Sequence, residues 1–539
     1  MKLSTSCWLA SLAVLPAFTA ADWQYRSRPD LAPPRLNITT SAAREQVEQG
    51  LLFVAPYPGA GPDARNPVQP AAYIFRDNGD LVWSGLGYFA GGVANFGVDT
   101  WDGRQVLHAF QGQRGETEGR SYGHHVILNS KYEPVKLVRG RSNRLGSAHE
   151  FRIVDDDFAL VEIGSTRPVG LSPWGGAKGQ DWILSTGFQE LNIETGEVVF
   201  QWESLDHVDP GNSAFPLAEL PSTTGLDSSS AWDYFHINSV DKDSQGNYII
   251  SARATSAIYK VNGTSGEVIW TLGGANSTFD MEPEAHFAYQ HDARLLSRSP
   301  DGTTDVLSLF DNAAASPEKQ ISSVSRARIV QLNHSDNTAK ALRTYPAPDG
   351  LSAQSQGNAQ VLPNGNVFVN WGQAGAITEF GEDGRVLFHA YLDSGPGGSL
   401  VQNYRGFRSN WTGSPSEDPA LVVVEGDARG KVEAYVSWNG DTEVVTWRFY
   451  AEPSPDRSPS LGEGRLVLGE AGRTGFETHL TLDVSRFRGE VLISAQAVDA
   501  KDRILVHTSS EAISRNPWGS PGLFRDPLSS EEHVATEEL

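Results

Sequence analysis

The stretch NYIISARATSAIYKVNGTSGEVIWTLGG, residues Asn247–Gly274, decides the fold class of this sequence. Its runs of Ile, Val, Tyr and Trp favour β-strands, because branched and aromatic side chains pack well on a pleated surface. The pair Asn262-Gly263 between two of these runs tolerates the positive φ of a tight hairpin. The stretch therefore predicts consecutive antiparallel strands joined by short turns.

The same pattern of strand, glycine turn and strand recurs at intervals of about 50 to 90 residues along the chain. Further examples lie at Ala71–Gly85, Phe188–Trp202, Gln360–Gly372 and Ile377–Tyr391. A short helix is expected only over Ser41–Leu51. Repeated four-stranded antiparallel units predict an all-β fold, and a β-propeller is favoured because its closed ring removes most exposed sheet edges. Two or three stacked β-sandwiches are the alternative.

A weak internal repeat supports the propeller. In six short strands one polar residue stands among apolar neighbours, and a glycine turn follows downstream. The polar residues are Asn95, His149, His236, His291, Asn358 and Arg405. Six such strands predict six blades, each of which sends one polar side chain towards a central channel.

Composition divides the chain into four parts. Residues 1–20 have a basic start, an apolar run of eleven residues and small residues at the end, which is typical of a secretion signal. Residues 21–418 hold the predicted six-bladed β-propeller. Residues 419–510 alternate like sandwich strands and predict a small, sandwich-like β domain. Residues 511–539 end in an acidic stretch that is expected to be disordered.

Cysteine and charge exclude several classes of function. The one cysteine, Cys7, lies within the predicted signal, so the mature chain is expected to have no disulfide, thiol nucleophile or cysteine-ligated metal. A net charge of −23 argues against nucleic acid as a partner, because nucleic-acid binding needs a basic surface. No metal site is expected either, since the adjacent His124 and His125 would point to opposite faces of a strand.

Two further features agree with secretion. After the signal there is no apolar run of about 18 residues, so no membrane span is expected. Five Asn-x-Ser/Thr sequons are candidate glycosylation sites: Asn37, Asn262, Asn276, Asn333 and Asn410. We therefore expect a protein that is secreted or resides in the secretory lumen.

Three of the repeat residues are histidines, and histidine is the side chain best suited to acid–base work near neutral pH. Asp233 precedes His236 and Asp292 follows His291, so a carboxylate is at hand for two of these rings. For any one of them, a buried histidine bonded to a backbone carbonyl is the alternative. Three histidines at equivalent places in a repeat favour a shared channel.

Six stretches carry a family pattern: WDYFHINSVDKDSQGNYIISARATSAIYKVNGTSGEVIWTLGG, FAYQHDARLL, LSLFDN, SAHEFRIVDDDFALVEI, QGNAQVLPNGNVFVNWG and YVSWNGDTEVVTW. Together they resemble the arylsulfotransferase family in its secreted fungal branch. The resemblance covers roughly Leu51–Glu452, and it implies a six-bladed β-propeller with ligands at the mouth of the central channel. In bacterial members a histidine takes a sulfuryl group from one phenolic ester and passes it to another phenol.

The resemblance also assigns site residues. His236 and His291 match the sulfuryl-binding histidines of the family, and His149 matches the HEF motif of the fungal branch. Asn358 stands where the family carries its nucleophilic histidine, and without that imidazole a two-step transfer loses its covalent intermediate. The remaining channel mouth is expected to bind a small aromatic substrate through Asn358, Arg405, Phe96, Trp232, Tyr234 and Tyr289.

Members of the fungal branch from natural-product pathways imply another reaction, the hetero-Diels–Alder joining of an o-quinone methide to a terpene alkene. For a phenolic or tropolone-like intermediate this chemistry needs no cofactor, metal or nucleophile. It needs an acid–base group that releases water from a benzylic alcohol, a role expected of His236 or His291. It also needs a donor to the phenolic oxygen, expected of Asn358 or Arg405. An aryl sulfotransferase and a non-catalytic ligand-binding propeller are the alternatives.

Overall fold

Tight turns set the strand boundaries of the stretch that decides the fold class. The computed structural model describes residues 24–59, 67–89, 91–114, 121–217, 219, 223–392, 401–453, 465–487 and 490–514. In the stretch Asn247–Gly274 the strands are β15 (Tyr248–Ala252), β16 (Ala257–Val261) and β17 (Val268–Gly273). Gly266 takes φ +77° in the last turn, where the side-chain oxygen of Asn262 accepts backbone N–H groups. The three strands pair antiparallel, as predicted.

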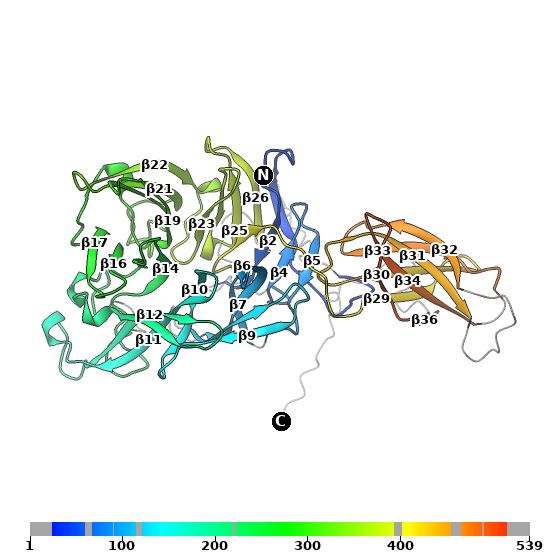
Figure 1. The fold of residues 1–539 in the computed structure, drawn as a ribbon, viewed down its shortest axis with the longest axis horizontal. Helices are drawn as coiled ribbons and strands as arrows, with labels where there is room; N and C mark the ends of the chain where they lie inside the picture. The colour runs from blue at the N-terminus through cyan, green and yellow to red at the C-terminus, as the bar shows by residue number, and fades with distance from the viewer. Residues whose placement is uncertain are drawn as a thin grey trace, which may run out of the picture.

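Six sets of four antiparallel strands follow one another within the described residues, and Figure 1 shows them around a common centre. The first set is β28 (Phe407–Ser409), β2 (Leu51–Val54), β4 (Tyr73–Phe75) and β5 (Leu81–Ser84). The second is β6 (Gly92–Trp101), β7 (Arg104–Arg114), β8 (Ser121–Leu128) and β9 (Pro134–Val138). The third is β10 (Leu145–Val154), β11 (Phe158–Pro168), β12 (Trp182–Asn192) and β13 (Val198–Glu203).

The remaining three sets repeat the same order. The fourth set places β14 (Ile237–Lys242) before β15, β16 and β17. The fifth is β19 (His291–Arg298), β20 (Thr304–Asp311), β21 (Arg326–Asn333) and β22 (Thr338–Pro346), with β18 (Asp280–Met281) parallel to β22. The sixth is β23 (Asn358–Val361), β24 (Val367–Asn370), β25 (Ala376–Phe380) and β26 (Val386–Leu392).

The N-terminal strand closes the sixth set. β1 (Leu36–Ser41) pairs antiparallel with β26. A strand near the start of the chain thus covers the outer edge of the sixth set, whose own strands come more than 300 residues later in the sequence. A short pair outside the six sets is β3 (Tyr57–Pro58) and β27 (Val401–Gln402). The helix expected over Ser41–Leu51 is wrong, because residues 42–50 form turns and bends between β1 and β2.

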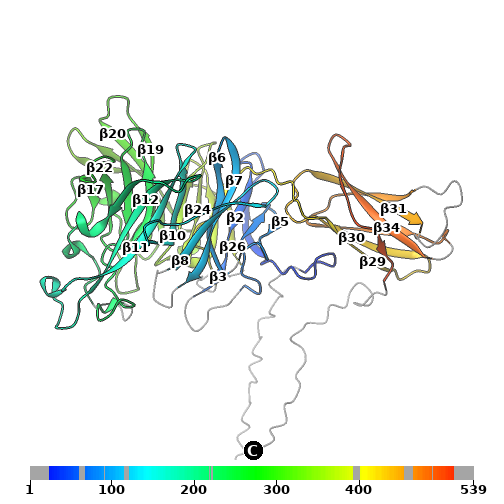
Figure 2. The same cartoon turned by 60° about the horizontal axis from the view of Figure 1, so that its bottom comes forward.

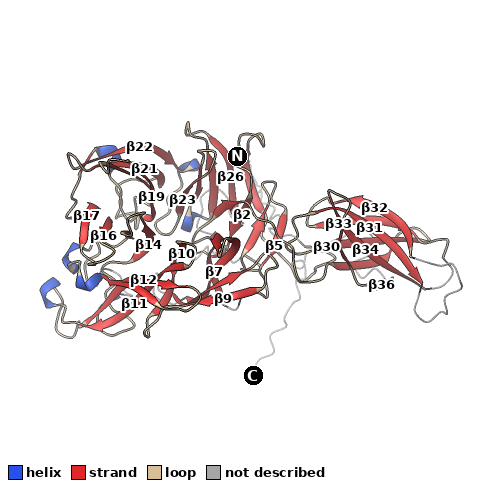
Figure 3. Ribbon diagram, viewed as in Figure 1, coloured by secondary structure: helices blue, strands red, loops and turns tan. Residues whose placement is uncertain are grey.

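Helix is confined to single turns in the described chain, as Figure 3 shows. The 3-10 turns are η1 (Ser172–Trp174), η2 (Ser204–Asp206), η3 (Pro210–Asn212), η5 (Pro283–Ala285), η6 (Pro348–Gly350) and η7 (Gly372–Ala374). None of the helices in the described part is long and apolar enough to cross a membrane. The all-β class predicted from the sequence is confirmed.

Carboxylate and amide side chains tie each inner strand to the next around the centre. In each bond a side-chain oxygen of one inner strand accepts a backbone N–H of the next. The acceptor and donor residues are Asp99 and Ile153 (2.9 Å), Glu150 and Val240 (2.9 Å), Asp241 and Leu295 (2.9 Å), Asp292 and Ala359 (3.3 Å), and Gln360 and Arg408 (2.9 Å). They link β6, β10, β14, β19, β23 and β28 in chain order. Apart from one pairing of β10 with β8 at Gly146 and Gly123, the inner edges of these strands have no ladder partner in the described sheets, and their backbone N–H groups need acceptors there. The strands of the sequence repeat are therefore neighbours around one centre.

The chain after residue 419 forms two further sheets beside the ring (Figure 1, Figure 2). One consists of β29 (Ala420–Glu425), β30 (Lys431–Ser437) and β33 (Glu477–Asp483). The other consists of β31 (Val444–Pro453), β32 (Leu466–Gly472), β34 (Val491–Asp499), β35 (Ile504–His507) and β36 (Glu511–Ala512). They enclose their own apolar core around Trp447 and Phe449. The predicted signal at 1–20 lies outside the described residues, as do residues 515–539 of the tail expected from 511. The start of that tail is not disordered, because Glu511–Ala512 forms β36 and pairs with β34.

Candidate active site

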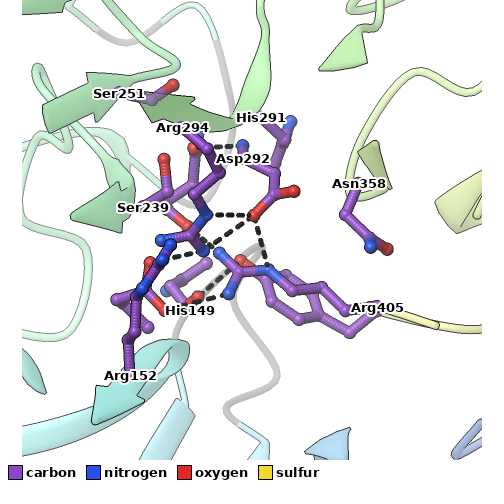
Figure 4. A network of polar contacts seen from close by, with 12 residues as sticks. His149, Arg152, Ser239, Ser251, His291, Asp292, Arg294, Asn358 and Arg405 are labelled. Atoms are coloured by element: carbon purple, nitrogen blue, oxygen red, sulfur yellow. Dashed lines mark hydrogen bonds and ion pairs between the residues drawn. The ribbon is translucent and has the colours of Figure 1, made fainter. Parts of the chain in front are cut away.

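The three predicted histidines lie on neighbouring inner strands. His149 is in β10, His236 directly precedes β14, and His291 is the first residue of β19. Figure 4 shows His149 and His291 beside a network of ion pairs that includes Asp292 and Arg405. The repeat thus brings three sequence-distant histidines to the same end of the ring centre.

His236 occupies a backbone conformation that few residues other than glycine adopt. Its φ is +57°, next to a register shift between β14 and β15, and its side chain is 12% exposed. Such conformations persist where the surroundings enforce them, and they concentrate at functional sites. Nδ1 of His236 lies 2.6 Å from Oδ2 of Asp233. This contact holds the Nδ1–H tautomer and leaves Nε2 as the reactive nitrogen.

His149 is held in the same way from a different strand. Its Nδ1 lies 3.0 Å from Oε2 of Glu162 in β11 and 2.7 Å from Oγ of Ser147. The carboxylate of Glu162 is buried, so it serves this ring rather than solvent. As in His236, Nδ1 is engaged and Nε2 has no hydrogen-bond partner within the described residues.

The two rings contact each other beside one small pocket. The ring centroids of His149 and His236 are 4.8 Å apart, edge to face. A pocket of about 30 Å³, lined also by Glu162, Asp233 and Thr186, adjoins both rings. That volume holds about one water molecule or one hydroxyl group. Two imidazoles beside one pocket can take a proton from one substrate atom and give a proton to another.

His291 has a different environment, in which both ring nitrogens are used. Nδ1 donates to Oδ1 of Asn312 (2.7 Å), and Nε2 accepts the backbone N–H of Gln356 (3.2 Å). Burial and the positive charge of Arg253 hold the pKa of His291 well below its usual range, so the ring is neutral. This geometry favours a role in fixing the segment around Gln356 over the acid–base role expected from the sequence.

Arg405 lies in a buried network below the histidines. It donates to Oε1 of Glu150 (3.0 Å) and to the carbonyl of Asn238 (2.6 Å), and Arg294 pairs with both Glu150 and Asp292. Burial raises the pKa of Glu150, but Arg294 and Arg405 outweigh it and lower the pKa to about 2. Arg405 is 2% exposed and is not among the residues that line the histidine pocket; it lines a separate cavity of about 310 Å³ together with Asp292 and Arg294.

The other expected substrate contacts are also engaged within the protein. Asn358 is fully buried and exchanges two hydrogen bonds with the backbone of Gly406, at 2.9 and 3.0 Å. Phe96 packs against Trp83 with ring centroids 5.6 Å apart, in a core away from the histidines. The structure therefore does not bring Asn358 or Phe96 to the histidine pocket.

The remaining predicted aromatic residues, Trp232, Tyr234 and Tyr289, are all buried in apolar clusters. Trp232 and Tyr234 belong to one apolar cluster. The indole N–H of Trp232 donates to the carbonyl of Phe215 (3.1 Å), and the hydroxyl of Tyr234 donates to the carbonyl of Val208 (3.2 Å). Tyr289 has φ +57° and packs on Phe215 with ring centroids 5.4 Å apart. None of the three lines the pocket between His149 and His236 within the described residues.

Sequence reasoning missed three residues of the site. Glu162 is a buried glutamate in an apolar strand, and that unusual placement was its one available signal. Tyr404 packs edge-to-face on His149 at 5.5 Å and donates to the His149 carbonyl (3.3 Å). Arg253 donates its backbone N–H to the carbonyl of His236 (2.9 Å), and its guanidinium lies 5.0 Å from the Phe215 ring centroid. In the described chain, no group of three or more His, Cys, Asp or Glu side chains is arranged to hold a metal ion.

Comparisons with solved structures give distant similarities. A protein of unknown function from Bacteroides caccae shares 14% identity over 67% of this chain and all of that chain, with a TM-score of 0.37. The GH43 protein BlXynB from Bacillus licheniformis shares 9% identity over 78% of this chain and 88% of its own, with a TM-score of 0.28. A catalytically inactive virginiamycin B lyase from Staphylococcus aureus shares 8% identity over 76% and 94%, with a TM-score of 0.27.

The comparison with family models assigns the chain to a family, which the distant structural similarities do not. No curated protein sequence matches this chain. The family model described as Arylsulfotransferase (ASST) matches residues 97–392, which is more than half of the chain. The matched region runs from β6 to the end of β26 and includes His149, Glu162 and His236. The chain therefore belongs to the arylsulfotransferase (ASST) family.

Proposed function

We propose that this protein is an acid–base enzyme that removes water from a small phenolic benzylic alcohol and joins the resulting o-quinone methide to an alkene. The observation that supports it is the pair of carboxylate-held imidazoles, His149 and His236, with ring centroids 4.8 Å apart at one pocket. The reaction needs one base and one acid at neighbouring oxygens of the same substrate, and this pair supplies both.

In the first step, Nε2 of His236 takes the phenolic proton while Nε2 of His149 gives a proton to the benzylic hydroxyl. The benzylic C–O bond breaks and water leaves. The electron pair of the phenolic O–H bond forms the carbonyl, and the ring electrons form the exocyclic C=C bond. Asp233 stabilises the imidazolium formed at His236, and Glu162 orients His149.

In the second step, the carbonyl oxygen and the exocyclic carbon of the o-quinone methide each form a bond to one carbon of the alkene. The aromatic ring is restored, and no group leaves. Protein catalysis of this step rests on holding the two reactants in one orientation, which replaces an entropic cost otherwise borne at the transition state. Proton exchange between His236 and His149 through solvent then resets the pair.

The charge of the pocket favours a neutral substrate over a sulfate ester. Glu162 and Asp233 both line it, and none of its described lining residues is an arginine or lysine. Two carboxylates oppose an anion at this point unless both imidazoles are protonated. A neutral hydroxyl group avoids that repulsion.

Family membership supports a second candidate, sulfuryl transfer between phenols. In this case Nε2 of His149 or His236 attacks the sulfur of an aryl sulfate, the S–O bond breaks, and a phenolate leaves. A second phenol then gives its proton to the other imidazole and takes the sulfuryl group. Arg253, whose charge acts on His291 and whose backbone N–H donates to the His236 carbonyl, is a cation on the same side of the site to offer to the sulfuryl oxygens.

Parallel assays of purified protein distinguish the two functions. One assay supplies 2-hydroxybenzyl alcohol with a trisubstituted alkene and follows chroman formation and its enantiomeric ratio. The other supplies p-nitrophenyl sulfate with a phenol acceptor and follows p-nitrophenol release. We expect an enantiomerically enriched chroman in the first assay and no release above background in the second. Sulfate transfer with racemic chroman at the uncatalysed rate would replace the first candidate with the second.

A further inference from the structure

A groove of about 630 Å³ lies between the propeller and the C-terminal sheets. It shares no lining residue with the histidine pocket. One wall comes from residues between β1 and β2 and from the β4–β5 turn, and the other from Thr442 and Glu443. All three residues of one sequon, Asn410, Trp411 and Thr412, line it. The groove is thus built around a consensus sequence for N-linked glycosylation.

Hydrogen bonds fix the two walls relative to each other. Asn439 exchanges two bonds with the backbone of Ser84, at 2.8 and 3.0 Å, and the N–H of Gly440 donates to Val82 (2.8 Å). On the far side, the N–H of Phe476 donates to the carboxylate of Asp80 (2.9 Å). The groove is therefore a formed surface between firmly attached parts rather than an accidental gap.

Asn410 differs from the sequon residues that lie in turns. The side-chain oxygens of Asn262 and Asn333 accept backbone N–H groups of their own turns, and Asn276 donates to Asn212. Asn410 and Thr412 are exposed, and it is the backbone carbonyl of Asn410 that accepts a hydrogen bond from the Gln105 side chain (3.2 Å). Among the five sequons, the one at Asn410 combines an exposed side chain with a groove beside it.

We propose that Asn410 carries an N-linked glycan whose first sugars lie in this groove and brace the C-terminal sheets against the propeller. The groove offers charged or amide groups on Gln49, Arg76 and Glu443, and its floor includes Trp411, which is 7% exposed and whose indole donates to Tyr132 (2.9 Å). Charged and amide side chains of this kind suit the hydroxyl groups of a sugar, which both donate and accept hydrogen bonds. A volume of this size is ample for the first two sugars of a glycan. The proposal rests on the predicted secretion and is independent of the proposed catalytic function.

The test uses the full chain, with its own N-terminal segment, expressed in a eukaryotic secretory host. Thr412→Ala removes the sequon, whereas Thr412→Ser keeps it and serves as the matched control. Asn37→Gln removes a sequon on the exposed face of β1. We expect glycopeptide mapping to find glycan at Asn410 in the wild type and in Thr412→Ser, and the peptide to be unmodified in Thr412→Ala.

Stability and accessibility then report where the glycan lies. In the folded protein we expect an endoglycosidase to release the Asn410 glycan about tenfold more slowly than the Asn37 glycan, with the difference lost after denaturation. Thr412→Ala is expected to lower the thermal unfolding midpoint by about 2 °C, and Asn37→Gln to leave it unchanged. An unmodified Asn410 in the wild type overturns the proposal. Equal release from both sites in the folded protein, or equal midpoints for Thr412→Ala and Thr412→Ser, overturns the placement in the groove.

Discussion

At the scale of single residues, the site depends on carboxylates that hold imidazole rings. Asp233→Asn keeps the size of the side chain near His236 but removes the charge that stabilises its imidazolium. We expect kcat for chroman formation to fall by about 100-fold, with little change in KM, because the effect falls on the proton-transfer step. Initial-rate kinetics against pH measure it. The control Asp383→Asn, in an exposed turn, should match the wild type, and an unchanged kcat in Asp233→Asn would remove Asp233 from the mechanism.

Glu150 has a residue-scale effect on stability rather than on chemistry. Its folded pKa of about 2 lies below its ordinary value of 4.5, so the ionised form stabilises the fold above pH 4.5, and this contribution is lost as the pH falls towards 2. Glu150→Gln leaves Arg294 and Arg405 buried with one carboxylate fewer, and we expect the free energy of unfolding at pH 7 to fall by about 3–5 kcal/mol.

Urea unfolding at a series of pH values measures this effect. Between pH 5 and pH 2 the wild type is expected to lose stability more steeply than Glu150→Gln, by about 3 kcal/mol in total. Glu382→Gln, an exposed partner of Arg343, is the control and should follow the wild type. If both variants have the same pH profile, Glu150 is not the group that titrates.

The residues of the site were predictable only in part. The repeat identified His149 and His236, because a polar residue in an apolar strand stands out. It placed Asn358 and Arg405 in the same group, since a repeat does not tell whether a polar atom is already bonded inside the protein. Glu162 stood out only as a glutamate in an apolar strand, and its contact with His149 required the pairing of β10 with β11.

At the scale of elements, turn chemistry predicted the strands well. Short turns bound the strands of Asn247–Gly274 as predicted, but the positive φ of the last turn falls on Gly266 and not on Gly263 of the expected Asn-Gly pair. The prediction of a helix over Ser41–Leu51 was wrong because an apolar residue within this segment packs into a core. Val47 packs into the core shared by the first and sixth sets, and that tertiary contact overrides a weak helical period.

Strand β1 yields a prediction at this scale. Replacing Leu36–Ser41 by a Gly-Ser segment of equal length removes its pairing with β26 and the partial burial of Leu36 and Ile38. We expect the free energy of unfolding to fall by about 2–3 kcal/mol, and self-association to rise because the edge of β26 becomes exposed.

Urea unfolding and size-exclusion chromatography measure the two effects. A matched control replaces only the outward-facing Asn37, Thr39 and Ser41 by serine or glycine, and it should remain close to the wild type. A monomeric segment variant with wild-type stability would show that β1 is not needed to close the ring.

At the scale of the whole molecule, the ring of six strand sets holds the candidate site in place. The inner strands are linked in chain order by side-chain-to-backbone bonds, and one of these strands, β10, holds His149. His236 lies directly before β14, where Asp233 and the backbone N–H of Arg253 hold it. The ring thereby fixes the distance between the two imidazoles, and catalysis by a preformed acid–base pair depends on that distance. The sequence predicted the ring through its repeats, whereas the pairing of two specific imidazoles required the three-dimensional register.

The most direct test of this account measures rate and enantiomeric ratio of chroman formation for the wild type, His149→Gln, His236→Gln and the double variant, with His479→Gln in β33 as the remote control. The account predicts that each single variant loses about 100-fold in rate, and that the double variant gives racemic product at the uncatalysed rate. His479→Gln should match the wild type. A double variant that retains the wild-type rate and enantiomeric ratio would contradict the claim that the paired histidines perform the chemistry.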